Sequence, residues 1–220
     1  MDRHRESETT CRVCLSGAAQ QFCTAGERLY WRCRRCAATF VDAAHLPDAH
    51  TERGEYLLHE NDPQDARYRG FLNRLVGPLQ EKLRPGMQGL DFGCGPGPAL
   101  GYMLAEKSCT IHCYDPFFRP DASLLERTWD FIFCSEVVEH FHRPGREFAR
   151  LDAMLKPDGW LGIMTCFQTE DERFERWHYR QDLTHVVFYR RETFEYIAGQ
   201  FGWRCEIPAD NVVLMQKRCK

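Results

Sequence analysis

The glycine-rich segment Gly93–Gly97 follows directly on a short apolar run and constrains the fold more than any other feature. Because glycine has no Cβ atom, the backbone there can pass close to a ligand. Downstream, the apolar run that starts at Ile111 ends on an acid, Asp115. A strand, a glycine turn, a helix and a second strand ending in a carboxylate form a nucleoside-cofactor site, in which the acid suits the two hydroxyls of a ribose. The pattern therefore predicts an α/β fold.

The spacing of the glycines bears on which cofactor fits. A dinucleotide site needs G-x-G-x-x-G, whereas residues 93–97 read Gly-Cys-Gly-Pro-Gly and Gly101 lies out of register. Asp91, at the end of the strand, would repel a pyrophosphate but can accept a hydrogen bond from a cationic amino-acid head group. The pattern favours a cofactor that carries an amino acid over a dinucleotide.

The segment Asp91–Gly97 resembles motif I of the class I S-adenosylmethionine (SAM) methyltransferases. Three further segments, Tyr114–Pro116, Asp130–Phe141 and Leu155–Leu161, resemble the same family and occur in its order. The core is most similar to small-molecule methyltransferases of the ubiquinone-biosynthesis type. The resemblance implies a Rossmann-like fold with SAM as cofactor, and it implies cofactor contacts by Asp91, Gly93, Cys94, Gly95, Gly97, Asp115, Pro116 and Glu136.

One interval departs from the family pattern. The family's sheet has seven strands with a reversed hairpin at one edge, and it places a helix, a third strand and a loop between Asp115 and Asp130. The chain has only about fifteen residues there, enough for a reduced version at most. We expect a sheet trimmed around strand three, with the adenine contacted by Phe117, Phe118 or backbone groups, and Asp121 as a weaker candidate.

Apolar periodicity predicts the other elements. Asp62-Pro63 is typical of a helix start, the helix that follows is interrupted at Gly77-Pro78, and residues 42–61 look irregular. Strands are expected at 89–92, 110–114, 130–134, 161–167, 203–207 and 212–216, and helices at 99–106, 146–155 and 193–201. The chain divides into an N-terminal module at 1–45, a linker and helix at 46–86, and a methyltransferase domain at 87–220.

Two C-x2-C pairs, Cys11/Cys14 and Cys33/Cys36, define the N-terminal module. Pairs at this separation are typical of zinc ligands, and the runs 20–24 and 28–31 between them read as short strands. Four thiolates leave no open coordination position, which predicts a structural Zn2+ in a zinc ribbon. Because so small a module cannot build much core, the metal would supply its folding energy. Cys23 reads as a spare thiol.

The composition bears on partners and compartment. The net charge of −3 gives no overall basic field for nucleic acid. Locally, Arg32, Arg34 and Arg35 would give the ribbon a basic tip. The alternative is that these three arginines form a solvated charged loop. No apolar stretch reaches membrane-spanning length, and the polar N-terminus has no signal region. Twelve cysteines without a signal peptide favour thiols and metal over disulfides. We expect a cytoplasmic protein without a membrane partner; its oligomeric state stays open.

Methyl transfer from a sulfonium is an in-line displacement, so the protein mainly positions the reactants. A base is needed only when the acceptor is protonated at working pH. Glu139-His140 resembles the Glu-His pair of the ubiquinone-type enzymes, and Glu139, His140 and His185 are the catalytic candidates. Whether His140 is a base or only orients its loop stays open.

The segment 177–189 is expected to line the acceptor pocket, because this fold usually builds that pocket from the same insertion. The predicted substrate contacts there are His178, Tyr179, Arg180 and Tyr189. His178 and His185 with Asp182 also resemble a mononuclear metal set, although nearness in sequence alone does not bring side chains together.

Three functions fit these residues. The leading hypothesis is a SAM-dependent methyltransferase that modifies a small molecule at oxygen, nitrogen or carbon. The first alternative is an RNA or protein methyltransferase that docks through the ribbon. Base flipping by the standard routes is disfavoured, because residues 134–137 lack the Asn/Asp-Pro-Pro-Tyr/Phe motif and the chain has no Pro-Cys pair. The second alternative is a non-catalytic SAM-binding scaffold, which the intact glycine loop and Asp115 oppose.

Overall fold

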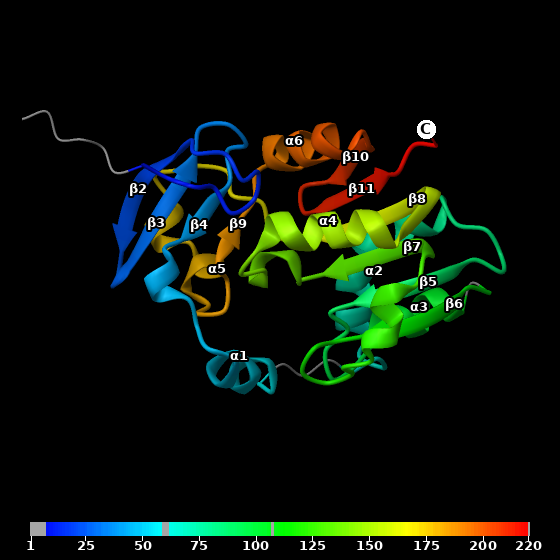
Figure 1. Ribbon diagram of the computed structural model, residues 1–220. Helices are drawn as coiled ribbons and strands as arrows, with labels where there is room; N and C mark the ends of the chain where they lie inside the picture. Colours follow the sequence, from blue (N-terminus) through cyan, green and yellow to red (C-terminus); the bar gives the residue numbers. More distant parts are fainter. Residues whose placement is uncertain (1–7, 59–61, 107, 220) are drawn as a thin grey trace, which may run out of the picture.

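The computed structural model describes residues 8–58, 62–106 and 108–219. Its larger sheet has six strands within these ranges, in the order β10-β11-β8-β7-β5-β6 (Figure 1). The strands are β5 (Gln88–Phe92), β6 (Thr110–Tyr114), β7 (Trp129–Ser135), β8 (Leu155–Met164), β10 (Arg204–Ala209) and β11 (Val212–Gln216). The first four are parallel, and β10 and β11 form an antiparallel hairpin at one edge. The predicted α/β sheet of the Rossmann-like methyltransferases is confirmed.

The sheet ends at β6, as the short interval after Asp115 predicts. Within the described chain this interval holds only a 3-10 helix, η2 (Ala122–Glu126), and no strand. The Asp121 side chain caps η2 by accepting the Ser123 N–H at 3.0 Å. Leu124 is buried, and its carbonyl accepts the indole N–H of Trp129 at 3.3 Å. Where the family has a third strand, this interval contributes the buried side chain of Leu124.

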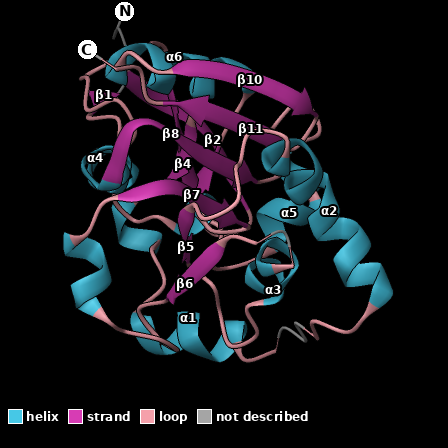
Figure 2. Cartoon of the chain, turned by 90° about the vertical axis from the view of Figure 1, so that its right-hand side faces the viewer, coloured by secondary structure: helices cyan, strands magenta, loops and turns pink. Residues whose placement is uncertain are grey.

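Alternate residues of β7 face two separate cores. Phe131 and Phe133 pack with the apolar residues of α2 (Ala66–Gln80) and α3 (Ala99–Ala105). Ile132 and Cys134 point to the opposite face, which α4 (Pro144–Met154) and α6 (Arg191–Phe201) cover. Figure 2 shows α2 and α4 on opposite sides of the strands. The period of two is what a strand buried on both faces requires.

The smaller sheet joins the N-terminal ribbon to the rest of the chain. It is antiparallel and contains β1 (Glu8–Thr9), β2 (Ala19–Ala25), β3 (Arg28–Cys33), β4 (Thr39–Val41) and β9 (Val187–Phe188), in that order. The two ribbon strands expected from the sequence are β2 and β3. Figure 1 shows β9, in orange, beside the blue strands of the ribbon. The division at residues 45 and 86 stays a prediction, but a strand from beyond residue 86 completes the ribbon's sheet.

The stretch 42–61, which reads as irregular, contains two helices: η1 (Ala43–His45) and α1 (Ala49–Tyr56). The prediction failed because α1 has few apolar residues, yet Asp48 caps it by accepting the Thr51 N–H at 2.8 Å. Residues 59–61 lie outside the described residues, as do the N-terminal residues 1–7.

Helix α2 also differs from its predicted bounds. It begins at Ala66, where Asp65 accepts the Arg67 N–H at 2.7 Å, whereas Asp62 caps only the preceding turn. The helix continues past Pro78 to Gln80. Because Pro78 lies in the last turn, its missing N–H costs a single hydrogen bond and does not end the helix.

The strand expected to start at residue 161 begins earlier, at Leu155, which pairs with Trp129. The register then shifts, and Asp158 adopts a positive φ of 60° in the turn. Within the described residues, no helix has the length and apolar character needed to cross a membrane.

Candidate functional site

A cavity of about 650 Å³ opens where β5, β6 and β7 end. Ligands of open α/β sheets bind at this edge, beyond the carboxyl ends of the strands. Loops that follow these three strands form most of its wall. All eight residues expected to contact the cofactor lie on it: Asp91, Gly93, Cys94, Gly95, Gly97, Asp115, Pro116 and Glu136. The structure therefore brings this set together, and direct contact with SAM stays a prediction.

Two residues of the glycine loop have backbone conformations that favour glycine. Gly93 and Gly95 have positive φ values of 83° and 61°. A Cβ atom on Gly93 would lie 2.7 Å from the nearest side-chain carbon of Val137. The backbone N–H of Gly93 donates to the carbonyl of Tyr114 at 2.8 Å. The loop is thus fixed between β6 and the segment after β7.

Asp115 links the glycine loop to the segment after β6. Its carboxylate accepts backbone N–H groups from Gly95 at 3.0 Å, Phe117 at 2.8 Å and Phe118 at 3.0 Å. Phe117 and Phe118 line the same part of the cavity, as the sequence predicts for adenine contacts. Asp121 does not, because it is exposed and caps η2, so it is not supported as an adenine contact.

Asp91 presents a buried carboxyl group to the cavity. Burial raises its pKa well above the ordinary value, and the nearby Cys113 and Asp115 add to this effect. A cation bound beside Asp91 would lower this pKa again, because it favours the ionised carboxylate. The site therefore suits a ligand with a positively charged group, such as the amino group of an amino acid.

Helix α1 supplies part of the wall that the sequence did not predict. Glu52 and Tyr56 line the cavity, and the Tyr56 ring lies edge-on to His140, with 5.2 Å between the ring centroids. The Glu52 carboxylate lies 3.1 Å from Nε2 of His142. An N-terminal cap at Asp48 with Glu52 in the first turn is the sequence signal that would have found this helix.

A buried polar cluster lies behind Glu136. The hydroxyl of Tyr179 lies 2.6 Å from Oε1 of Glu139 and 3.2 Å from Oε2 of Glu136. Its single proton can serve only one carboxylate at a time. Burial, followed by repulsion from Glu139, raises the pKa of Glu136 to about 9. This shift favours the protonated form of Glu136 at neutral pH.

Two histidines on the cavity wall have the same tautomer. Nδ1 of His140 lies 3.0 Å from the carbonyl oxygen of Thr184, and Nδ1 of His185 lies 2.6 Å from that of Tyr179. A carbonyl can only accept, so each Nδ1 carries the hydrogen and each neutral ring has its lone pair on Nε2. The two ring centroids are 4.8 Å apart. Burial lowers the pKa of His140, which favours the neutral form.

The structure separates several of the expected acceptor contacts from the cavity. Within the described residues, His178 is exposed at the start of α5 (His178–Gln181) and does not line the cavity. The guanidinium of Arg180 donates to Tyr30 at 3.2 Å and so faces the ribbon. Tyr189 is fully buried and donates to the carbonyl of Val138 at 2.8 Å. Their positions do not support direct contact with an acceptor: His178 lies off the cavity, and the side chains of Arg180 and Tyr189 have other partners. Tyr179 is not on the cavity wall, but it contacts two residues that are, Glu136 and His185.

The predicted metal set does not assemble as expected. Nε2 of His185 lies 3.7 Å from Oδ2 of Asp182, but His178 is not among the described groups that could share an ion with them. His185 instead lies with Glu139 and His140, one ligand atom of each being within 4.8 Å of the others. Glu139 and His140 come from η3 (Val138–His140).

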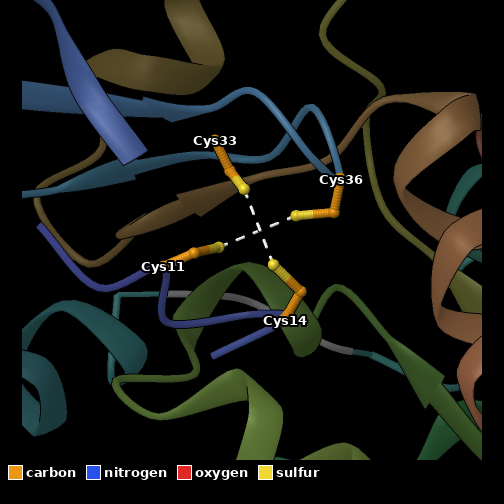
Figure 3. A group of neighbouring side chains, drawn as sticks. All are labelled: Cys11, Cys14, Cys33 and Cys36. Atoms are coloured by element: carbon orange, nitrogen blue, oxygen red, sulfur yellow. Dashed lines mark hydrogen bonds between the residues drawn. The ribbon is translucent and has the colours of Figure 1, made fainter. Parts of the chain in front are cut away.

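The four cysteines of the ribbon converge on one point (Figure 3). Their sulfurs are 3.5 Å apart for Cys14 and Cys33 and 3.6 Å apart for Cys11 and Cys36. A tetrahedral ion with Zn–S bonds of about 2.3 Å separates its sulfurs by roughly 3.8 Å, so the donor set fits zinc. All four side chains are buried, and all four are free thiols.

The structure does not place Arg32 in the basic tip expected for the ribbon. Its guanidinium pairs with Asp171 at 2.7 Å and lies over the ring of Phe22, 4.3 Å from the centroid. Arg35 lies over the ring of Tyr196 at 5.6 Å. Arg32 is therefore part of the packing between the ribbon and the segment after β8, and neither a free phosphate contact nor a solvated charge.

Comparison with known proteins agrees with this architecture. The sequence model of a family described as "Methyltransferase domain" matches residues 59–206. No curated protein has a matching sequence.

Solved structures with the same fold include 1,6-didemethyltoxoflavin-N1-methyltransferase of Burkholderia thailandensis, with bound 1,6-didemethyltoxoflavin and S-adenosylhomocysteine. It is 17% identical over 90% of this chain and 99% of that one, with a TM-score of 0.52. A protein of Pyrococcus horikoshii is 16% identical over 77% of this chain and 99% of its own, also at 0.52. The S-adenosylhomocysteine-bound CalO1, a methyltransferase in calicheamicin biosynthesis, is 12% identical over 78% of this chain and 59% of its own, at 0.51.

Proposed function

Because the chain belongs to the family of methyltransferase domains, we propose that it transfers the methyl group of SAM to a small molecule held beside His140 and His185. One observation carries the proposal: the glycine loop, Asp115 and both histidines line a single cavity of about 650 Å³. Cavities of this size hold small-molecule ligands. Cofactor and acceptor would therefore share one cavity, as an in-line displacement requires.

The cofactor end offers candidate partners for the ribose, the adenine and the amino group of SAM. Asp115 would hold the ribose hydroxyls, Phe117 and Phe118 the adenine, and Asp91 the amino group of the methionine part. When bound, SAM supplies an already activated methyl group. The residues of the chain then have only to orient it, and the hydrogen bond from Gly95 to Asp115 keeps the loop and the acid in register before SAM arrives.

The acceptor end has two groups that can take a proton. The lone pairs on Nε2 of His140 and His185 belong to rings on the cavity wall, and burial favours the neutral form of His140. A hydroxyl or amine acceptor beside either ring would lose its proton to Nε2 as its oxygen or nitrogen receives the methyl group. Glu139 has a positioning role, because it is buried behind the wall.

A small-molecule acceptor is favoured over RNA or protein. Helix α1 narrows the cavity beside the proposed acceptor, because Glu52 and Tyr56 line it and Tyr56 contacts His140. Arg32, which would have extended a basic docking surface, is paired with Asp171. For the ribbon we propose a structural Zn2+ bound by Cys11, Cys14, Cys33 and Cys36, which would brace the segment that carries His185.

The test is to incubate methyl-labelled SAM and the protein with a cell extract and then separate the products by size. We expect label in the small-molecule fraction, and no label with Gly95→Arg, whose side chain would fill the cofactor end. Label in macromolecules that is lost on nuclease or protease treatment would contradict the proposal and favour docking through the ribbon. Absence of transfer by a protein that binds SAM, tested across several extracts, would favour the scaffold alternative.

A further inference from the structure

We propose that Cys94 and Cys113 form an oxidative modification site at the cofactor end of the cavity: hydrogen peroxide joins the two thiols in a disulfide, and the disulfide closes the site to SAM. The thiol pair stands on its own geometry, whereas its effect on the cofactor rests on the proposed function. Both thiols are free, and the pair is separate from the four cysteines of the ribbon.

The backbone brings the two cysteines together. Strands β5 and β6 are parallel neighbours at one edge of the larger sheet, and Asp91 on β5 pairs with Cys113 on β6 (Figure 1). Beyond β5 the chain turns at Gly93, whose N–H and that of Cys94 donate to the same carbonyl, that of Tyr114, at 2.8 and 3.1 Å. This turn places Cys94 beside the strand that carries Cys113.

The side chains of the two cysteines meet beneath the glycine loop. Cys113 lies beside the carboxyl group of Asp91, because a Cβ atom on Gly101 of α3 would be 3.7 Å from the Cys113 sulfur and 3.6 Å from Oδ2 of Asp91. The Cys94 thiol reaches the same place and forms a hydrogen bond with Cys113. Rotation of the two side chains can bring sulfurs in such contact to the S–S length of about 2 Å.

The two thiols differ in reactivity. The hydrogen bond from Cys94 lowers the pKa of Cys113 to about 7, with help from the charge of Arg119 and against the effect of burial. Much of Cys113 is therefore thiolate at neutral pH, which is the nucleophilic form. The same hydrogen bond, burial and the nearby Asp91 raise the pKa of Cys94, which stays a thiol. An accessible thiolate beside a second thiol is typical of redox-sensitive sites, and Cys113 is only half-buried.

Oxidation proceeds in two steps. The Cys113 thiolate attacks one oxygen of hydrogen peroxide, the O–O bond breaks, and the leaving hydroxide takes up a proton to become water; Cys113 is then a sulfenic acid. The Cys94 sulfur attacks the sulfur of Cys113, the S–S bond forms as the S–O bond breaks, and the hydroxide leaves as water with the proton of the Cys94 thiol. The two thiols lose two electrons in total, and the peroxide gains them.

The disulfide changes the part of the loop that would hold SAM. Cys94 lines the cavity, and its thiol donates to the carbonyl of Gly95 at 3.5 Å. The N–H of Gly95 in turn donates to Asp115 at 3.0 Å. A bond to Cys113 removes the first of these hydrogen bonds and pulls Cys94 toward β6, so the loop and Asp115 lose the register proposed for SAM. Bound SAM, in turn, would cover Cys94 and slow its oxidation.

Peptide mapping of the zinc-loaded protein after hydrogen peroxide treatment tests the site. We expect a peptide linked through Cys94 and Cys113, a loss of about tenfold or more in affinity for S-adenosylhomocysteine, and recovery of that affinity with dithiothreitol. Cys113→Ser should bind S-adenosylhomocysteine as the reduced wild type does and keep its affinity after peroxide. The matched control is Cys205→Ser, a half-buried thiol on β10 at the opposite edge of the sheet, which should lose affinity as the wild type does.

Wild-type protein that forms no link between Cys94 and Cys113 would overturn the proposal. A linked protein with full affinity would overturn it as well, as would an equal loss of affinity in Cys113→Ser together with release of zinc. Binding of S-adenosylhomocysteine to the reduced wild type keeps the two proposals apart. Cofactor binding without the link contradicts only the thiol pair, whereas a link in protein that never binds the cofactor contradicts only the proposed function.

Discussion

Phe40 of the ribbon pairs with Val187, two residues after His185, in one antiparallel ladder. The Val41 N–H also donates to the carbonyl of Val186 at 2.9 Å. The strand that follows the four-cysteine site therefore holds the segment that presents His185 to the cavity. The ribbon is therefore part of the framework of the proposed acceptor site.

Cys33→Ser should consequently damage the acceptor site as well as the ribbon. We expect loss of bound zinc and a free energy of unfolding lower by more than about 3 kcal/mol, since structural Zn2+ binding is worth on the order of 10 kcal/mol. Hydrogen exchange should increase at residues 184–189. Cys23→Ser, which changes a thiol outside the cluster, should cost under about 1 kcal/mol. If hydrogen exchange at residues 184–189 were unchanged in the zinc-free protein, the ribbon would not support the segment that carries His185.

Gly93→Ala should weaken both folding and cofactor binding. The new Cβ would lie 2.7 Å from a Val137 carbon, at a φ of 83° that strains any other residue. We expect a loss of about 2 to 5 kcal/mol in the free energy of unfolding. Gly199→Ala is the control: its Cβ meets nothing within 4 Å in α6, so it should stabilise by about 0.5 to 1 kcal/mol. Denaturant unfolding measures both, and equal stability of the two variants would contradict the loop geometry.

Glu136→Gln should stabilise the unliganded protein increasingly as pH rises. The folded pKa of Glu136 is raised from 4.5 to about 9, so between these values the folded state holds a proton that the unfolded state releases. The wild type therefore loses stability across this window, by at most about 1.4 kcal/mol per pH unit. The glutamine variant lacks this loss. If the stability difference between variant and wild type were independent of pH from 5 to 8, Glu136 would be ionised in the folded protein.

His140 predicts an acid limit for methyl transfer. Its pKa is lowered from the ordinary 6.5, chiefly by burial, so its Nε2 lone pair is available until the pH falls below that value. As the pH drops further, the ring becomes an imidazolium that can no longer accept a proton. The logarithm of kcat should be flat at neutral pH and fall on an acid limb centred below 6.5. In His140→Asn the acid limb should disappear and most of kcat should be lost. An acid limb that is unaltered in this variant would belong to another group.

The cofactor side was predictable from sequence because its signals are local. The Gly93–Gly97 loop and Asp115 follow two strands whose carboxyl ends must meet in a parallel sheet. The signals for the four-cysteine cluster are equally local, since each C-x2-C pair forms its own turn. Leu15 and Ala37, with positive φ values of 59° and 60°, follow these pairs without the glycine that usually marks such positions.

The acceptor side was less predictable because it depends on side-chain direction. Within residues 177–189, only the fold decides that His185 points to the cavity while Arg180 points to the ribbon. The grouping of His185 with Glu139 joins segments far apart in the chain. Helix α1 was missed because its apolar pattern is weak and the contacts of its Tyr56, with Phe117 and His140, join segments far apart in the sequence.

Titration calorimetry with S-adenosylhomocysteine tests the central claim, that this cavity is the SAM site, most directly. The wild type should bind one equivalent, and Asp121→Ala, which changes an exposed acid on the same loop, should bind equally. Asp115→Asn has a single amide oxygen, which can still accept the Phe117 and Phe118 N–H groups but not the Gly95 N–H as well. This variant should lose about tenfold in affinity, or ~1.4 kcal/mol. Full affinity in a folded Asp115→Asn protein, or no binding by the folded wild type, would contradict the account.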